Sequence, residues 1–197
     1  GNRAGSTPFR EAKATGFEVE VLAMPANDLT LSASLGWLDT EITQADLVEL
    51  TGGFQVDLKG LELPKAPRLT ASLAGEYRWA MADNDAWVRL EYIRRDGQYS
   101  DIEGLTNKQT RGPSPNQGLV RPVGPGEFPY LSPDYSVINL RAGYDTENIQ
   151  VVLYVQNLAD KEYYTGTQEN FGASGIRLRP HPRTIGISVG YMVGGAR

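Results

Sequence analysis

Period-two alternation of apolar and polar residues is the feature of this sequence that most restricts its fold. In residues 15–24, Phe17 and Val19 fall on one face, and Glu18 and Glu20 fall on the other. Successive side chains of a β-strand point to opposite faces, whereas a helix needs apolar residues three and four positions apart. The same alternation returns in six further segments, 29–38, 68–79, 86–95, 135–144, 149–156 and 183–193. The sequence therefore predicts seven strands and an all-β chain, with at most a helical turn in 45–50.

The connections between these strands alternate strictly between short and long. The short ones are rich in Pro, Asn and Asp and lie at 25–28, 81–85 and 145–148. The long ones span about 39–67, 96–134 and 157–182, and Gly and Pro in them disfavour regular ladders. In an up-and-down sheet, this alternation places all the long connections at one end. Outer-membrane β-barrels have this layout, with short periplasmic turns and long extracellular loops.

Aromatic side chains are predicted to lie at both ends of the apolar faces. Tyr77, Trp79, Tyr144 and Tyr191 fall near the short turns, and Trp37 falls near the long connections. Amphipathic rings at these positions suit the two interfaces of a membrane. A soluble β-sandwich or lipocalin-like small-molecule binder would alternate equally well, and the rings would then belong to its core. Because loop asymmetry and aromatic placement agree, we favour an antiparallel up-and-down transmembrane β-barrel.

The predicted strand number bears on how much of a barrel this chain forms. Bacterial single-chain barrels have an even number of strands, and seven is odd. The last strand would run from a long connection to the short-turn side, so the strand at 15–24 would begin on the long-loop side. We therefore expect residues 1–14 to be the remnant of an extracellular loop and residues 15–197 to be the C-terminal part of a larger barrel. That would also explain why the chain starts without a signal peptide.

Composition argues against several other functions. The formal net charge of −5 gives no electrostatic reason to expect nucleic-acid binding. The sequence has no cysteine and one histidine, His181, which excludes thiolate and His-cluster metal sites and most catalytic triads. An outer-membrane barrel enzyme that uses His181 remains an alternative, although no serine lies in a Gly-x-Ser-x-Gly context. We predict no catalytic residue, no metal site and no cofactor.

Four segments of the chain carry a resemblance to a known family. They are residues 16–42, 63–79, 155–165 (VQNLADKEYYT) and 182–193 (PRTIGISVGYMV). The Asn-Leu-x-Asp-Lys-x-Tyr corner, followed by Pro-Arg and a tyrosine near the C-terminus, is the most specific element. The segments resemble the C-terminal β-barrel of TonB-dependent outer-membrane receptors, over about residues 15–193.

The resemblance implies a barrel of about 22 strands in the outer membrane of a Gram-negative bacterium, filled by an N-terminal plug domain. It implies contact with outer-membrane lipid and uptake of a scarce ligand such as a ferric siderophore, cobalamin, haem or an oligosaccharide, driven through the TonB protein. The plug and the segment that contacts TonB belong to the missing N-terminal region, so we expect no energised transport by this chain alone. Two open edge strands should make the isolated fragment self-associate.

The resemblance places ligand recognition on the long connections and the upper inner wall. Eight residues there could supply aromatic walls or guanidinium groups for anions: Tyr99, Arg111, Arg121, Tyr130, Tyr163, Tyr164, Gln168 and Arg177. For each of them the alternative is an ordinary solvated loop residue. Five charged residues of the polar face are expected to form cross-strand charge pairs: Glu76, Arg78, Arg89, Glu91 and Arg141. Asn157, Asp160 and Lys161 are expected to fix the corner through local hydrogen bonds.

Overall fold

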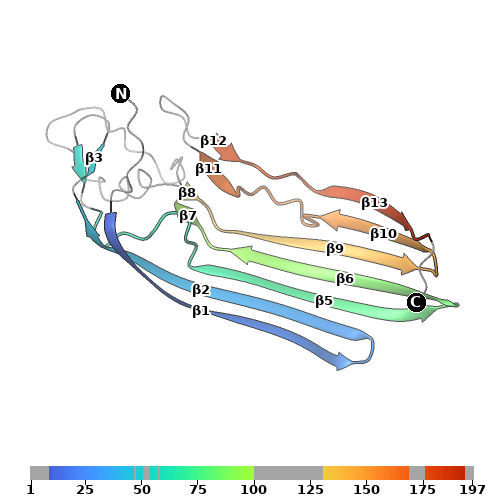
Figure 1. Cartoon of the computed structure of the whole chain (residues 1–197). Helices are drawn as coiled ribbons and strands as arrows, with labels where there is room; N and C mark the ends of the chain where they lie inside the picture. The colour runs from blue at the N-terminus through green and yellow to red at the C-terminus, as the bar shows by residue number, and fades with distance from the viewer. Residues whose placement is uncertain are drawn as a thin grey trace.

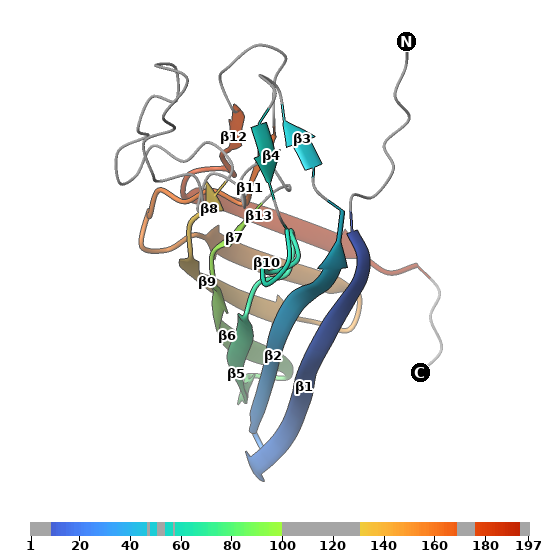
Figure 2. The ribbon, with the colours of Figure 1, turned by 90° about the vertical axis from the view of Figure 1, so that its left-hand side faces the viewer.

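One antiparallel sheet dominates the fold. The structure is a computed structural model that describes residues 9–46, 48–50, 54–56, 58–99, 131–168 and 176–193. The sheet has seven strands in sequence order: β1 (Phe9–Ala26), β2 (Leu29–Ala45), β5 (Leu69–Met81), β6 (Asn84–Arg95), β9 (Tyr135–Asp145), β10 (Ile149–Gln156) and β13 (Thr184–Tyr191). It curls into an open trough and is not closed, because β1 and β13 each have one partner among the described strands (Figure 2). The predicted all-β class and seven strands are confirmed.

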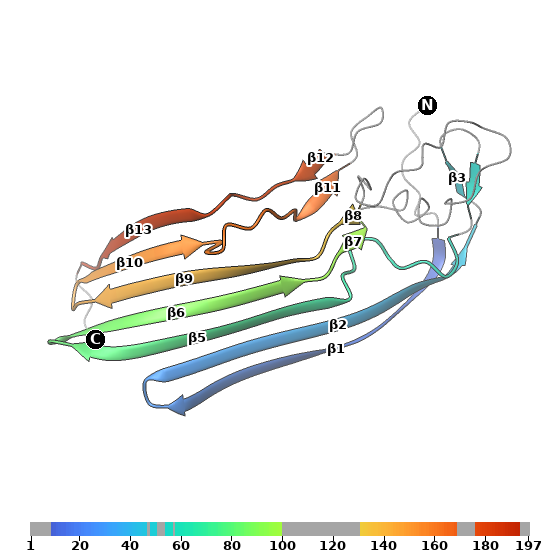
Figure 3. The ribbon, with the colours of Figure 1, turned by 180° about the vertical axis from the view of Figure 1, so that it is seen from behind.

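The described parts of the long connections lie at one end of this sheet, as the alternation of loop lengths predicts (Figures 1 and 3). We call this the upper end. Three short ladders lie in these connections: β3 (Val48–Leu50) with β4 (Phe54–Val56), β7 (Gln98–Tyr99) with β8 (Leu131–Ser132), and β11 (Gly166–Gln168) with β12 (Ile176–Leu178). The predicted helical turn at 45–50 is wrong, because β2 extends to Ala45 and β3 follows it. Among the described residues, no helix is long and apolar enough to cross a membrane.

The first two strands are longer than predicted. β1 begins at Phe9 instead of residue 15, and β2 ends at Ala45 instead of residue 38. β1 and β2 continue to pair with each other above Trp37, the last residue of β2 that pairs with β5. Lys13, for example, lies opposite Glu41 there. Alternation fails as a signal in this part because polar residues occupy both faces.

Apolar side chains form continuous rows across one face of the sheet, which we call the outer face. Val19 lies opposite Leu35, and Leu73 lies opposite Tyr92 on the next strand pair. These side chains are exposed; Leu73, for example, keeps 55% of its surface accessible. A soluble sandwich would cover such a face with a second sheet, whereas a membrane wall presents it to lipid. The polar face opposite is the inner face.

Aromatic pairs bound the outer face at both ends. Phe17 and Trp37 stack near the upper end, and Tyr77 and Trp79 stack near the short turns, each pair with ring centroids 5.9 Å apart. Trp37 lies opposite Leu69, ten positions before Trp79 on β5. Ten strand residues rise roughly 33 Å along the strand. At a tilt of about 40°, this gives a height of about 25 Å, which matches the apolar band of transmembrane barrels.

A small apolar cluster lies above this band, beside the upper part of β2. Ile42 and Leu58 are fully buried there, and Leu61 packs against them. The Ile42 N–H donates to the Leu61 carbonyl at 2.8 Å, and the Ile42 carbonyl accepts from Gly60 at 2.8 Å. Residues 58–61 of the connection to β5 therefore continue the backbone pairing beside β2, which fixes this part of the upper end.

Candidate functional site

A row of inner-face residues crosses the sheet near its upper end. Register pairs Glu18 with Gly36, Gly36 with Thr70, Thr70 with Arg95, and Arg95 with Tyr135. Directly opposed residues of antiparallel strands point to the same face. These five residues, which we call the upper row, therefore lie side by side on β1, β2, β5, β6 and β9.

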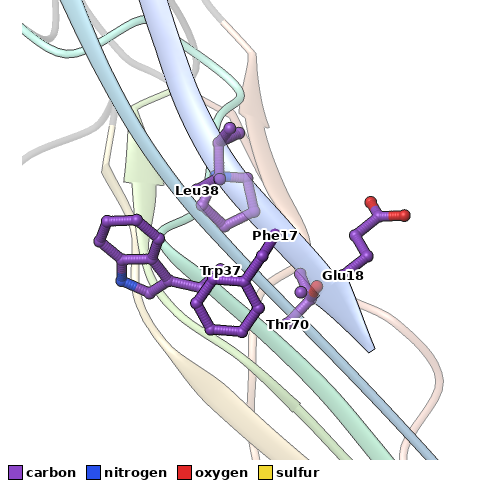
Figure 4. Close-up of a pocket in the computed structure, with 8 residues that line it drawn as sticks. Phe17, Glu18, Trp37, Leu38 and Thr70 are labelled. Atoms are coloured by element: carbon purple, nitrogen blue, oxygen red, sulfur yellow. The ribbon is translucent and has the colours of Figure 1, made fainter. Parts of the chain in front are cut away.

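Two glycines open a hollow of about 460 Å³ along the first half of the upper row. A Cβ atom on Gly36 would lie 2.8 Å from Thr70 Oγ1, and one on Gly16 would lie 2.4 Å from a backbone oxygen. The Glu18 side chain extends away from the stacked rings of Phe17 and Trp37 (Figure 4). Its carboxylate therefore provides the negative charge at this end of the row.

A second hollow of about 230 Å³ surrounds the middle of the upper row. Its lining residues are Ser34, Thr70, Ala71, Ser72, Ile93, Arg94, Arg95 and Tyr135. The Arg95 guanidinium donates to Gln98 Oε1 at 3.3 Å, but its Nε atom is buried and has no hydrogen-bond partner among the described residues. The guanidinium has further N–H donors beside the one that binds Gln98, so Arg95 can bind an additional acceptor or an anion.

Tyr163 extends the upper row beyond β9. Its ring packs on Tyr135, with centroids 4.9 Å apart and the planes tilted by 32°. Burial raises the pKa of the Tyr163 phenol, and Tyr135 raises it further. The Tyr163 hydroxyl therefore stays protonated at neutral pH. Together with Arg95, the two tyrosines form an aromatic patch with several hydrogen-bond donors. This patch suits an anionic ligand with acceptor oxygens.

The segment that carries Tyr163 is held in place by the predicted corner at residues 157–161. Asn157 is 3% exposed and has a φ of 52°. Its side-chain amide donates to the Lys161 carbonyl at 2.9 Å, and its Oδ1 accepts from the Lys161 N–H at 3.0 Å. Its backbone N–H donates to Asn139 Oδ1 at 3.0 Å, and Asp160 Oδ1 accepts from the Arg183 N–H at 3.1 Å. The structure confirms that local hydrogen bonds of Asn157, Asp160 and Lys161 fix this corner.

The other predicted ligand-binding residues are more dispersed. Tyr99 packs against the apolar cluster beside β2, and its carbonyl accepts from Lys65. Tyr164 is half-buried in the corner, while Gln168 lies on β11 and Arg177 on the partner strand β12. Arg111, Arg121 and Tyr130 lie outside the described residues. Of the five that the structure describes, it brings Tyr163 to the upper row, and ligand binding by all eight stays a prediction.

Arg95 and Tyr135 were missed as candidates by sequence reasoning. Both lie at the upper ends of predicted strands, on the polar face. If residues 86–95 and 135–144 were assumed to pair from their upper ends, Arg95 would be placed opposite Tyr135, as it is in the structure.

The predicted charge pairs lower on the inner face are partly confirmed. Arg78 and Arg89 approach Glu76 at 2.8 and 3.8 Å, the second of these across strands. Glu91 instead accepts from the side-chain amide of Asn139 at 2.9 Å. Arg141 has no hydrogen bond or ion pair with any described residue. The prediction fails for Glu91 and Arg141 because register places Glu91 opposite an asparagine and Arg141 opposite Arg89.

Comparisons with known proteins agree with this architecture. The fold is similar to the ferric yersiniabactin uptake receptor FyuA from Yersinia pestis, with 19% identity, a TM-score of 0.63 and coverage of 91% of this chain and 23% of that one. It is similar to the siderophore receptor PiuA from Acinetobacter baumannii, with 21% identity, a TM-score of 0.66 and coverage of 91% and 22%. The ferripyoverdine receptor of the Pseudomonas aeruginosa outer membrane gives 18% identity, a TM-score of 0.56 and coverage of 91% and 19%.

These three likenesses establish the fold, and the chain spans about a fifth to a quarter of the length of each receptor. The family itself follows from the sequence. Residues 4–158, well over half of the chain, match the family described as TonB dependent receptor-like, beta-barrel. The chain therefore belongs to the TonB-dependent receptor-like β-barrel family.

Proposed function

We propose that this chain forms the C-terminal wall of an outer-membrane receptor that takes up a ferric siderophore. One observation supports the proposal most directly. The exposed apolar band lies on the outer face of the sheet, and the upper row lies on the inner face opposite it. The band provides the lipid contact, and the row provides a cation, phenols and hollows at the end that carries the long connections. Family membership and three structural neighbours that are siderophore receptors support this choice of ligand.

The chemistry of the upper row suits such a ligand. A ferric complex with oxygen donors presents acceptor oxygens, and many such complexes are anionic. Arg95 provides a charged guanidinium beside the second hollow, and Tyr135 with Tyr163 provides an aromatic surface with two hydroxyls. The predicted ligand residues of the long connections would complete the site from above.

The proposal also includes the remainder of the receptor. Additional strands would pair with β1 and β13 to close the barrel in the outer membrane of a Gram-negative bacterium. A plug domain would fill its interior, and TonB would supply the energy for transport. Without those additional strands, the open edges should make the isolated chain self-associate.

Binding to the purified full-length receptor in detergent tests the proposal. A panel of ferric siderophores should contain a ligand that quenches receptor fluorescence at micromolar concentration or below. R95Q should weaken its binding by about 10-fold or more, because a hydrogen bond to a charged group contributes about 1.5–3 kcal/mol. R10Q is the matched control, since Arg10 pairs with Asp46 far from the row. Equal affinities of R95Q and R10Q would contradict the proposed site, and a receptor that fractionates as soluble would contradict the membrane location.

A further inference from the structure

The two hollows along the upper row meet at Thr70. This residue lines the first hollow together with Glu18 and the second together with Arg95. The hollows therefore adjoin, and we call the two of them the row groove. Its ends carry opposite charges, because Glu18 lies on β1 and Arg95 lies on β6. These two residues are three strand spacings apart, which is roughly 14 Å along the sheet.

The Glu18 side chain borders a notch in the floor of the row groove (Figure 4). A Cβ atom on Gly36 would lie 3.8 Å from Glu18 Cγ and 2.8 Å from Thr70 Oγ1. Because Gly36 has no side chain, this space stays open between a carboxylate and a hydroxyl. A carboxylate only accepts hydrogen bonds, and a hydroxyl can also accept them. The notch therefore suits a positively charged group with several N–H donors, such as a primary ammonium.

Neither charged end of the row groove is neutralised by an ion pair among the described residues. Glu18 has no hydrogen bond or ion pair there, and neither has Glu20, the next inner-face residue of β1. At the other end, the Arg95 guanidinium donates to the neutral side chain of Gln98. The row groove is therefore acidic at its β1 end and basic at its β6 end, and its charge pattern is that of a receptor for a dipolar molecule.

We propose that the row groove selects an elongated ferric chelate whose anionic oxygens bind Arg95 and whose flexible arm ends in a protonated amine that binds Glu18. The inference rests on the proposed function and specifies the class of siderophore. Leu38 and Pro67 also line the first hollow, and they provide apolar contacts for the methylene groups of such an arm. Glu18 is therefore a specificity-determining residue, whereas Arg95 would bind anionic chelates with or without an amine.

Binding of two matched chelates to the purified full-length receptor in detergent tests this inference. One probe is a ferric tris(catecholate) with an aminoalkyl arm that places the nitrogen roughly 14 Å from the chelate oxygens. The other probe is the same chelate with its amine acetylated. The receptor should bind the amine probe about fivefold more tightly; the factor is modest because Glu18 is exposed and water screens its charge. Equal affinities for the two probes would overturn the inference.

Three variants then identify the group that recognises the amine. E18Q should bind both probes with the affinity that the unsubstituted receptor has for the acetylated one. E20Q is the matched control, because Glu20 does not line the first hollow, and it should keep most of the preference. R95Q should weaken both probes by a similar factor and leave the preference unchanged. A preference that survives E18Q, or that E20Q removes as completely, would overturn the inference.

The same measurements distinguish a failure of this inference from a failure of the proposed function. If both probes bind equally and R95Q weakens both, the upper row binds ferric chelates without selecting an amine, so the proposed function stands and this inference fails. If neither probe binds, this inference also fails, and the wider panel of ferric siderophores decides the proposed function separately. A panel without any ligand would contradict both.

Discussion

Replacing Asn157 by alanine should destabilise the receptor by about 3 kcal/mol. The substitution removes two side-chain hydrogen bonds to the Lys161 backbone, at 2.9 and 3.0 Å, which together contribute about 2 kcal/mol. It also puts an alanine at a φ of 52°, which costs about 1 kcal/mol because the Cβ atom approaches the following carbonyl oxygen. The hydrogen bond from the residue 157 N–H to Asn139 is backbone-donated and is retained. N157G separates the two effects, since glycine tolerates the positive φ but also lacks the amide, and it should cost about 2 kcal/mol.

Guanidinium unfolding of the full-length receptor in lipid vesicles, followed by tryptophan fluorescence, measures these differences. A159S is the matched control, because Ala159 is an exposed residue of the same corner and should change stability by less than about 0.5 kcal/mol. Hydrogen exchange should show faster exchange of the Lys161 amide in both Asn157 variants, because both lose its acceptor. If N157A is as stable as A159S, the corner does not depend on the Asn157 side chain. If N157A and N157G are equally destabilised, the argument from backbone strain is wrong.

Three further predictions concern the packing, the lipid contact and the pH dependence. G143A should cost about 2 kcal/mol in the same unfolding assay, because the new Cβ displaces the Trp87 indole, whereas G190A, with no atom closer than 4.0 Å, should be tolerated. L90R should cost about 2–4 kcal/mol, since Leu90 is 52% exposed near the middle of the apolar band, and a cost below about 1 kcal/mol would contradict lipid contact. The raised pKa of Tyr163 favours the neutral phenol, so its contribution to stability is present below the ordinary pKa of 10.0 and is lost as pH rises through the folded-state pKa. Y163F should remove that loss, and an unchanged dependence of stability on pH between 9 and about 12 would refute this assignment.

The main sheet is predictable because its two faces meet different surroundings over the full height of the apolar band. Residues 29–37 alternate without a break, and β2 places their apolar members on the outer face. Above the band this contrast disappears, and so does the alternation. Ile42 is apolar and buried there, but its partner Leu58 comes from the following connection. No periodicity links those two residues, so the upper part of β2 and its cluster were beyond sequence reasoning.

The corner and the upper row differ in predictability for the same kind of reason. Asn157 binds Lys161, which is four residues later in the chain, so the conformation of the corner can be predicted from its local sequence. Arg95 and Tyr135 meet across a connection of 39 residues, and their contact depends on the register between β6 and β9. Long connections are also the part of a fold whose conformation depends least on local pattern. The candidate ligand residues on them therefore remain predictions, whereas the inner wall beneath them follows from strand register.

The corner is joined to the inner wall by a continuous set of hydrogen bonds. Asn139 donates to Glu91 at 2.9 Å and accepts from the Asn157 N–H at 3.0 Å. Asn157 in turn fixes Lys161, two residues before the ring that packs on Tyr135. The position of Tyr163 therefore depends on contacts that lie outside the upper row itself.

This arrangement separates two ways of weakening the proposed ligand site. N157A should lower stability and also weaken ligand binding, because the corner that positions Tyr163 is lost. R95Q should weaken binding while the Lys161 amide keeps its slow exchange, because the Arg95 guanidinium donates to Gln98 and not to the Asn157 or Lys161 groups that hold this amide. Measuring affinity and amide exchange on both variants distinguishes a contact with the ligand from a positioning contact. If N157A keeps full affinity despite its faster exchange at Lys161, then Tyr163 does not contribute to the ligand site.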